Sequence, residues 1–267
     1  MRQLTHTLEL KAKEVLSPDS YLLKFKAGDL AGQFTPGQFL EADCGGYIFR
    51  PFGLMHQDPV AGELWLGVKV VGESSRFLVE LPLGAKVEVH APLGRGFQVA
   101  NFQEILAVGG GSGIFPLYEV LKTSAQEGKS THLVCGFRSE AEAYPRQLFS
   151  TWAQELYFSS DQGGLDFTGH AGACLDHFFA ERTFRPQTLL IACGPLPLLR
   201  YVRDFAQARN LACQLSLEEN MACGLGLCAG CSIDIRNEKG ELDRVRCCVE
   251  GPVFPGNQVV FPGDPYP

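Results

Sequence analysis

The chain has 267 residues, of which 45% are hydrophobic and 20% are charged, and its formal net charge is −7. This composition is typical of a globular protein, and the length suits two domains with a small appendage. The negative charge argues against nucleic acid or an anionic membrane as a partner.

Residues 1–100 have the pattern of a small all-β domain. Strand-like alternation covers 8–25, 64–71 and 86–90, and Gly and Pro residues separate these stretches. Short strands at this regular spacing favour an antiparallel barrel.

Two short segments of this domain are candidate phosphate sites. Arg50-Pro51-Phe52-Gly53 places a guanidinium, which can grip a phosphate, beside an aromatic ring that can stack on a flat ring system. The segment Gly72-Glu73-Ser74-Ser75 precedes a helix-like stretch, whose N-terminus favours an anion, and Lys69 lies nearby. Taken singly, each segment is more often an ordinary surface turn.

From residue 105 the pattern changes to strands that alternate with helices. Strands are expected at 105–108, 131–137, 156–160 and 188–193, and helices near 114–122, 143–154, 174–181 and 196–209. This alternation predicts a doubly wound parallel sheet, which we assign to residues 101–216.

Two turns of this domain are candidate dinucleotide sites. Gly109-Gly110-Gly111-Ser112-Gly113 joins a strand to a helix N-terminus, where backbone N–H groups and the helix dipole favour a pyrophosphate. Cys193-Gly194-Pro195 closes another strand at the same edge of the sheet, where ligands of such folds bind. The glycine run is not the G-x-G-x-x-G fingerprint, and alone it fits a tight turn equally well.

The choice between NAD and NADP stays open at this point. No carboxylate stands directly at the end of strand 131–137, where one would bind a ribose. Arg138-Ser139 follows that strand and suits a 2′-phosphate, although Glu140 lies one residue further on.

The segment 217–267 carries the most specific motif of the chain. Cys223, Cys228 and Cys231 have the C-x4-C-x2-C spacing of plant-type [2Fe–2S] sites, and Cys247 or Cys248 supplies a fourth thiolate. Small residues between these cysteines allow the backbone to wrap closely around a cluster. A structural zinc site would pair two C-x2-C knuckles, and this segment has one.

The remaining cysteines are scattered, as expected of free thiols in a reducing compartment. The opening residues lack the apolar stretch of a secretory signal, and apolar runs such as 188–193 are too short to span a bilayer. We therefore expect a cytoplasmic protein.

Taken together, these motifs resemble one family of flavin reductases, in which an FAD barrel and a nicotinamide-binding domain occur as in ferredoxin–NADP reductase. Within it, the chain is most similar to electron-transfer subunits of NAD-linked, two-subunit dihydroorotate dehydrogenase, an enzyme of pyrimidine biosynthesis. The matching segments are PGQF (36–39), RPFG (50–53), GVKVVGESS (67–75), PLGRGF (92–97), GGGSGIFPL (109–117), CGPLPLL (193–199), MACGLGLCAGC (221–231) and CCVEGPVF (247–254).

The resemblance implies three cofactors, which are FAD, NAD and a [2Fe–2S] cluster. For FAD it implies Arg50, Pro51, Phe52 and Gly53, with Phe52 near the isoalloxazine, then Gly67, Val68 and Lys69, and Ser74 and Ser75 at the pyrophosphate. For NAD it implies Gly109, Gly110, Gly111, Gly113, Cys193, Gly194 and Pro195. The C-x-x-G-P-V-F context selects Cys248 as the last cluster ligand and leaves Cys247 as a spare thiol.

The chain departs from the family pattern at three places in the FAD site. Gly53 replaces a usual Ser or Thr, Val68-Lys69 replaces an aromatic-basic pair, and Ser74-Ser75 replaces Gly-Thr. Ser75 and Lys69 preserve the hydroxyl and the charge, whereas Gly53 loses a hydrogen bond.

The implied activity is an electron relay that needs no catalytic side chain. Electrons would pass between NAD(H), FAD, the cluster and an FMN in a separate catalytic subunit, in an expected heterotetramer of two copies of each subunit. In the biosynthetic direction, dihydroorotate becomes orotate and NAD+ is reduced.

Two other hypotheses remain. The same relay could serve another partner, such as an anaerobic sulfite reductase, a hydrogenase or an NADH-dependent ferredoxin–NADP oxidoreductase, although the last typically departs from an all-cysteine motif. A non-enzymatic redox carrier or sensor would bind neither FAD nor NADH.

Overall fold

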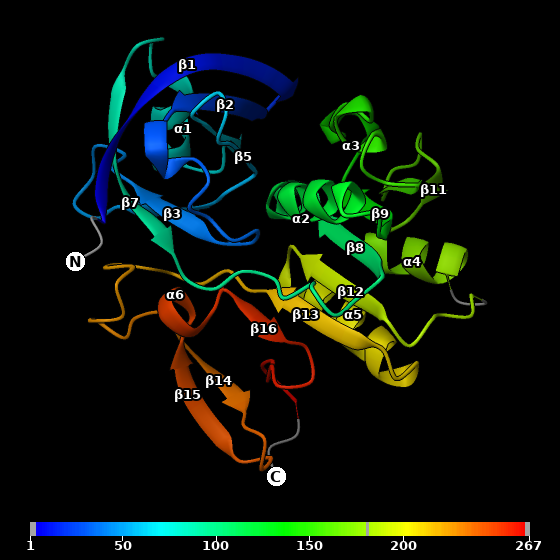
Figure 1. The fold of residues 1–267 in the computed structure, drawn as a ribbon. Helices are drawn as coiled ribbons and strands as arrows, with labels where there is room; N and C mark the ends of the chain where they lie inside the picture. The colour runs from blue at the N-terminus through cyan, green and yellow to red at the C-terminus, as the bar shows by residue number, and fades with distance from the viewer. Residues whose placement is uncertain (1–3, 180–181, 265–267) are drawn as a thin grey trace.

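The computed structural model describes residues 4–179 and 182–264, which contain two large sheets and a small hairpin (Figure 1). The first sheet has the order β4-β3-β7-β1-β2-β6-β5, and each neighbouring pair is antiparallel, as the sequence predicts. Along β6 buried and half-buried side chains alternate, because successive side chains of a strand point to opposite faces. Its elements are β1 (Thr5–Ser17), β2 (Ser20–Lys26), the 3-10 turn η1 (Gly28–Leu30), β3 (Phe39–Ala42), β4 (Arg50–Gly53), β5 (His56–Asp58), β6 (Glu63–Lys69), α1 (Glu73–Glu80) and β7 (Lys86–Leu93).

The second sheet has the order β11-β10-β9-β8-β12-β13-β16. It is parallel except at β16, which pairs antiparallel with β13, so the predicted parallel sheet is confirmed. Its strands are β8 (Glu104–Gly110), β9 (Ser130–Phe137), β10 (Glu155–Ser160), β11 (Phe167–Thr168), β12 (Thr188–Cys193), β13 (Ala212–Ser216) and β16 (Val253–Pro255).

Helices cover both faces of the second sheet, which confirms the doubly wound arrangement. The 3-10 turn η2 (Gly111–Ile114), α2 (Phe115–Gln126) and α3 (Gln147–Ser150) pack on one face, and α4 (Ala171–Phe179) and α5 (Leu196–Ala208) pack on the other. Every side chain of β12 is buried between these layers. No helix in the described ranges is long and apolar enough to cross a bilayer.

The expected helix at 143–154 is wrong over most of its length. Only the 3-10 turn η3 (Glu140–Glu142) and the four-residue helix α3 form near it. Pro145 accounts for the missing start of this helix, because it disfavours helical geometry at Tyr144 and lacks an N–H group. Of the expected helix at 174–181, the last two residues lie outside the described residues.

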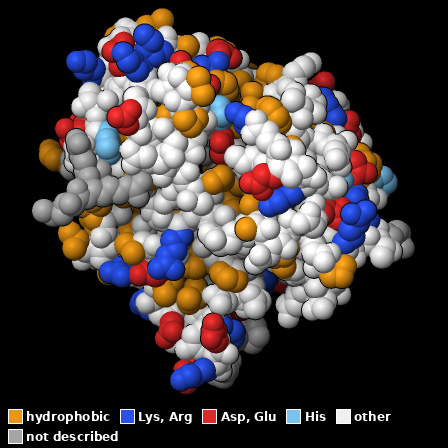
Figure 2. Space-filling model, viewed as in Figure 1, with side chains coloured by type: hydrophobic (Ala, Val, Ile, Leu, Met, Phe, Trp, Pro, Cys, Tyr) orange, Lys and Arg blue, Asp and Glu red, His pale blue; other side chains and the backbone are white. Residues whose placement is uncertain are grey.

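The cysteine-rich segment follows β13 and returns to it. It forms the hairpin of β14 (Ser232–Arg236) and β15 (Leu242–Arg246), then α6 (Cys247–Glu250), and ends with β16 on the edge of the second sheet. The hairpin projects from the body of the molecule and carries acidic and basic side chains, including the Asp234–Arg244 ion pair (Figures 1 and 2).

The two large sheets approach each other through glycines. A Cβ atom on Gly67 of β6 would lie 2.2 Å from Cγ of Phe115 in α2, and one on Gly53 would lie 2.6 Å from Cγ of Pro116. Both distances are far below van der Waals contact, so only glycine allows the start of α2 to sit this close to the first sheet.

A buried polar cluster joins the same two layers. His56 of β5 contacts the Glu119 carboxylate of α2 through Nδ1, and Lys122 Nζ lies 3.0 Å from His56 Nε2. The side chains of His56 and Glu119 are 3% and 6% exposed. Leaving one of these groups unpaired would be costly, so the cluster favours a single docking of α2 on the first sheet.

A second buried acid, Glu41 of β3, lies beneath the cysteine loop. It is fully buried, and within the described ranges neither carboxylate oxygen has a hydrogen-bond partner. A Cβ atom on Gly224 would lie 2.2 Å from this carboxylate, and His90 Nδ1 is 4.0 Å away. Burial, with a smaller contribution from the negative Cys223 sulfur, raises the pKa of Glu41 to about 7.

This raised pKa predicts that Glu41 makes the fold less stable as pH rises. The folded chain holds the Glu41 proton more tightly than the unfolded chain, so stability is full below the ordinary pKa of 4.5 and falls until about pH 7. Glu41→Gln should remove about 3 kcal/mol of this pH dependence. Urea unfolding of both proteins at pH 5 and pH 8 measures it, and an unchanged pH dependence in the variant would contradict the prediction.

Candidate functional site

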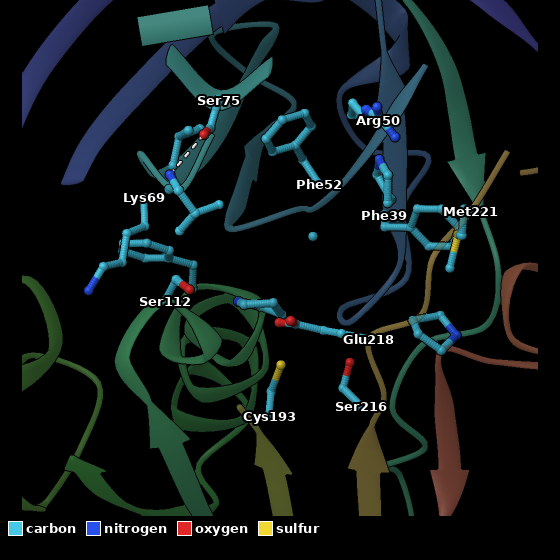
Figure 3. A pocket seen from close by; sticks show the side chains of 18 of the residues that line it. Phe39, Arg50, Phe52, Lys69, Ser75, Ser112, Cys193, Ser216, Glu218 and Met221 are labelled. Atoms are coloured by element: carbon cyan, nitrogen blue, oxygen red, sulfur yellow. Dashed lines mark hydrogen bonds between the residues drawn. The ribbon is translucent and has the colours of Figure 1, made fainter. Parts of the chain in front are cut away.

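A first cavity of about 660 Å³ lies between the first sheet and the carboxyl ends of β12 and β13 (Figure 3). Its volume is typical of a site for a small molecule or cofactor. Phe52 lies across the cavity from Cys193 and Ser216 (Figure 3). The residues expected to hold FAD all line this cavity, namely Arg50, Pro51, Phe52, Gly53, Gly67, Val68, Lys69, Ser74 and Ser75.

One end of the cavity is built for an anion. The Arg50 guanidinium donates a hydrogen bond from Nε to Ser74 Oγ over 3.3 Å, at the N-terminus of α1. A helix N-terminus and a guanidinium both favour phosphate. The Ser75 hydroxyl instead accepts the N–H groups of Val71 and Gly72 at 2.9 and 3.1 Å, so it holds the turn in place.

The departures at Gly53 and Val68 have structural reasons. Pro116 occupies the space that a side chain at position 53 would need, so the serine or threonine of the family pattern has no room there. Val68 is 1% exposed and packs in the core of the first sheet, so its backbone faces the cavity.

Lys69 is held at the border of the cavity by two carboxylates. Its Nζ lies 2.7 Å from Glu142 and 3.3 Å from Asp19. Burial works to lower the pKa of Lys69, but the hydrogen bonds and charges of Glu142 and Asp19 outweigh it and raise the pKa. The ammonium group therefore stays charged.

A second cavity of about 770 Å³ opens on the other side of Lys69, at the carboxyl edge of the second sheet. Ligands of open α/β sheets bind at this edge. Gly110, Gly111, Gly194 and Pro195 line this cavity, as expected for NAD. The other three expected residues do not line it: Gly109 packs against Ile114, Gly113 packs against the Cys193 backbone, and Cys193 faces the first cavity.

Several residues that line the cavities are not predicted from the sequence. Asp161 follows β10 directly and lines the second cavity with Arg138, His170 and Tyr201. The ribose-binding carboxylate is expected after β9, whereas this acid stands after β10, the neighbouring strand of the sheet. The position of Asp161 directly after a buried strand is the sequence feature that could have identified it. Ser216 and Glu218, which also line the first cavity, had no motif to mark them, whereas Met221 belongs to the segment 221–231 but was assigned no role.

The cysteine loop points backbone N–H groups at its sulfurs. Cys228 N lies 3.4 Å from Cys223 Sγ, Gly230 N lies 3.4 Å from Cys228 Sγ, and Cys248 N lies 3.4 Å from Cys231 Sγ. The N–H groups of Cys228, Leu225 and Leu227 lower the pKa of Cys223 to about 6. Hydrogen bonds of this kind stabilise thiolates, so the loop fits an iron–sulfur cluster.

The loop also distinguishes Cys247 from Cys248. Cys247 is fully buried, and its thiol points toward the Leu217 carbonyl at 3.7 Å. The Cys248 thiol instead lies beside Cys231, where the N–H group of Gly226 approaches it. This geometry supports Cys248 as the fourth ligand, with Cys223, Cys228 and Cys231.

An apolar wall separates the first cavity from the cysteines. Phe39 and Met221 line the cavity and are 3% and 7% exposed. Both belong to the same buried cluster as Cys231, Cys247 and Cys248. A cofactor in the first cavity would therefore face the cysteine loop across a dry, well-packed layer.

Three family models match consecutive parts of the chain. Residues 7–97 match the oxidoreductase FAD-binding domain, and residues 107–204 match the oxidoreductase NAD-binding domain. Residues 218–260 match the iron-sulfur cluster binding domain of dihydroorotate dehydrogenase B. The chain therefore has sites for FAD, NAD and an iron–sulfur cluster.

A solved structure titled as an NADH-dependent reduced ferredoxin-NADP oxidoreductase matches with a TM-score of 0.84 at 25% identity. The match covers 97% of this chain and 91% of that one.

Two curated relatives are named "Dihydroorotate dehydrogenase B (NAD(+)), electron transfer subunit". The one from Caldanaerobacter subterraneus subsp. tengcongensis is 33% identical over 85% of this chain and 87% of its own length. The one from Fusobacterium nucleatum is 30% identical over 91% of this chain and 94% of its own. The chain belongs to the family of dihydroorotate dehydrogenase B electron transfer subunits.

Proposed function

We propose that this chain carries electrons between NAD(H) and a catalytic subunit that oxidises dihydroorotate to orotate. Electrons pass between NAD(H) and that subunit through two cofactors. These are FAD in the first cavity and a [2Fe–2S] cluster on Cys223, Cys228, Cys231 and Cys248. The names of the curated relatives support the reaction, and the three matched domains support the cofactors.

The observation that carries this proposal is the order of the three sites. The two cavities share a border at Lys69, Ser112 and Glu218. On the side of Phe39 and Met221, the first cavity backs onto the core cluster that holds the cysteines. A nicotinamide, a flavin and a cluster placed in these sites would lie in sequence.

The side chains of the site bind and orient, and none has to act as an acid or a base. Arg50, Ser74 and the N-terminus of α1 hold the FAD phosphates, and Lys69 keeps a positive charge at the border between the cavities. Phe39 and Met221 exclude water on the cluster side. When bound, FAD supplies the conversion between the two-electron chemistry of nicotinamide and the one-electron chemistry of the cluster.

We further propose that the catalytic partner carries FMN and that the complex contains two copies of each subunit. Residues 1–100, 101–216 and 217–267 serve as the FAD, NAD and cluster parts. The free cysteines of the described chain support a cytoplasmic location. The mass of the purified complex and its FMN content test the composition.

A second candidate keeps the cofactors and changes the partner. The similarity to an NADH-dependent reduced ferredoxin-NADP oxidoreductase structure favours it, because that match covers nearly the whole of both chains. Copurification with a subunit of such a complex, rather than with a dihydroorotate-oxidising flavoprotein, would select this candidate.

The central test is coupling to dihydroorotate. After anaerobic co-expression with the dihydroorotate-oxidising subunit, the complex should reduce NAD+ when dihydroorotate is added. Cys228→Ser should lower this rate about a hundredfold or more, because the relay loses its cluster. Absorbance at the NADH band measures the rate.

NADH oxidation with ferricyanide is the matched control for this experiment, because it needs FAD alone. It should stay within about twofold in Cys228→Ser. If the wild-type chain carries FAD and the cluster but does not reduce NAD+ with dihydroorotate, the proposed role in dihydroorotate oxidation is wrong. The second candidate function is then favoured.

A second prediction distinguishes the adjacent cysteines. Cys248→Ser should abolish the visible and electron paramagnetic resonance spectra of the [2Fe–2S] cluster, because it removes a ligand. Cys247→Ser should retain them, since its hydroxyl can donate to the nearby Leu217 carbonyl. The opposite pattern would make Cys247 the ligand.

A third prediction concerns the nucleotide. The Asp161 carboxylate in the second cavity would bind a ribose 2′-OH and repel a 2′-phosphate, which favours NAD. Asp161→Ser should lower the ratio of kcat/KM for NADH over NADPH about tenfold, since it removes a charge-assisted hydrogen bond and a repulsion. Ferricyanide reduction with each nucleotide measures the ratio, and an unchanged ratio would leave Asp161 without this role.

A further inference from the structure

One face of β3 is directed at the cysteine-rich segment. In Figure 1 the strands β3 and β7 lie directly above α6 and that segment. Leu40 and Ala42 belong to the core of the first sheet, whereas Phe39 belongs to the cluster that contains the buried cysteines. Because side chains alternate along a strand, Glu41 lies on the same face as Phe39. An acid therefore stands where the first sheet meets the cysteine loop.

The Glu41 carboxylate is not compensated by its surroundings. It is fully buried, and neither oxygen has a hydrogen-bond partner among the residues that the structure describes. Its cross-strand neighbour on β7 is His90, whose Nδ1 lies 4.0 Å from Glu41 Oε2, too far for a hydrogen bond. The ring of His90 stacks on Phe49 instead, with 4.5 Å between the ring centroids.

The carboxylate packs against the loop beside a cysteine that we assign to the cluster. A Cβ atom on Gly224 would lie 2.2 Å from Glu41 Oε2, and Gly224 directly follows Cys223. The negative sulfur of Cys223 acts on Glu41, as the raised pKa of this acid shows. Electrostatic coupling is reciprocal, so a charge on Glu41 acts equally on charge that is added at the cysteine loop.

The property that such a charge changes is the reduction potential. A [2Fe–2S] cluster on four thiolates gains one electron when it is reduced, and nearby charges and hydrogen bonds set how readily it does so. Backbone N–H groups 3.4 Å from Cys223, Cys228 and Cys231 favour the added negative charge. A buried carboxylate on the other side of the loop opposes it, and burial limits screening by solvent.

We propose that Glu41 tunes the cluster, because its buried carboxylate against Gly224 lowers the reduction potential of the cluster. The reduced cluster thereby becomes a stronger electron donor to the flavin, which favours electron flow toward NAD+. This inference rests on the proposed function, since it requires a cluster on Cys223, Cys228, Cys231 and Cys248.

The test is a redox titration of the FAD- and cluster-loaded chain, followed by electron paramagnetic resonance at pH 9, where the Glu41 carboxyl group is charged. At the potential that leaves half of the wild-type cluster reduced, Glu41→Gln should raise the ratio of reduced to oxidised cluster about tenfold. For a one-electron couple this corresponds to a potential about 59 mV more positive.

Glu41→Met is the second variant, because the amide of glutamine could itself donate a hydrogen bond to a sulfur. Methionine has a similar length and no donor, so a charge effect predicts a shift in the same direction in both variants. Neither variant buries a charge, so both should fold at least as stably as the wild type at this pH.

Glu88→Gln is the matched control, because Glu88 lies on the neighbouring strand β7 but is exposed. Its cluster should titrate like that of the wild type. An unchanged potential in both Glu41 variants, a shift to more negative potential, or a shift in only one of them would overturn the inference. A wild-type chain without the resonance signal of a [2Fe–2S] cluster would instead overturn the proposed cluster, which separates the two failures.

Discussion

The close approach of α2 to the first sheet is the constraint on which the rest of the structure depends. Gly67 and Gly53 leave room for Phe115 and Pro116, and the His56–Glu119–Lys122 cluster selects one docking of the helix. Because η2 leads directly into α2, this docking also places Ser112 between the cavities. Packing against these glycines thus sets the relative position of the first and second cavities.

Charged groups at the contact between the two large sheets are paired, whereas the acid beneath the cysteine loop is not hydrogen-bonded. Polar groups that dock the two sheets are paired, as in Lys69 with Glu142 and His56 with Glu119. The carboxylate of Glu41, beneath the cysteine loop, has no hydrogen-bond partner in the described residues, and its nearest charged neighbour is His90 at 4.0 Å. Paired groups contribute to a fixed geometry, whereas a buried acid without a hydrogen bond weakens the fold. Glu41 stands beside the cysteine loop.

The fold and the cysteine motif could be predicted from the sequence, because each depends on local patterns. Strand alternation, the glycine turn after β8 and the C-x4-C-x2-C spacing need no tertiary information. Asp161 could not be assigned a role in this way, because its relation to the second cavity comes from parallel strands that end at one edge of the sheet. The helix expected at 143–154 is wrong at its start, where Pro145 outweighs the apolar pattern. At Gly53 the sequence indicated a lost hydrogen bond, and the structure shows that Pro116 requires the glycine.

The pairing of β16 with β13 ties the cysteine-rich segment to the second sheet. The segment that holds the cysteines leaves the second sheet after β13 and adds its last strand to the edge of that sheet. A shorter chain that ended at residue 216 would expose β13 as an open edge, which invites pairing with other molecules. The cysteine segment therefore has a second role in the fold, because its last strand covers the edge of the sheet that would otherwise be open.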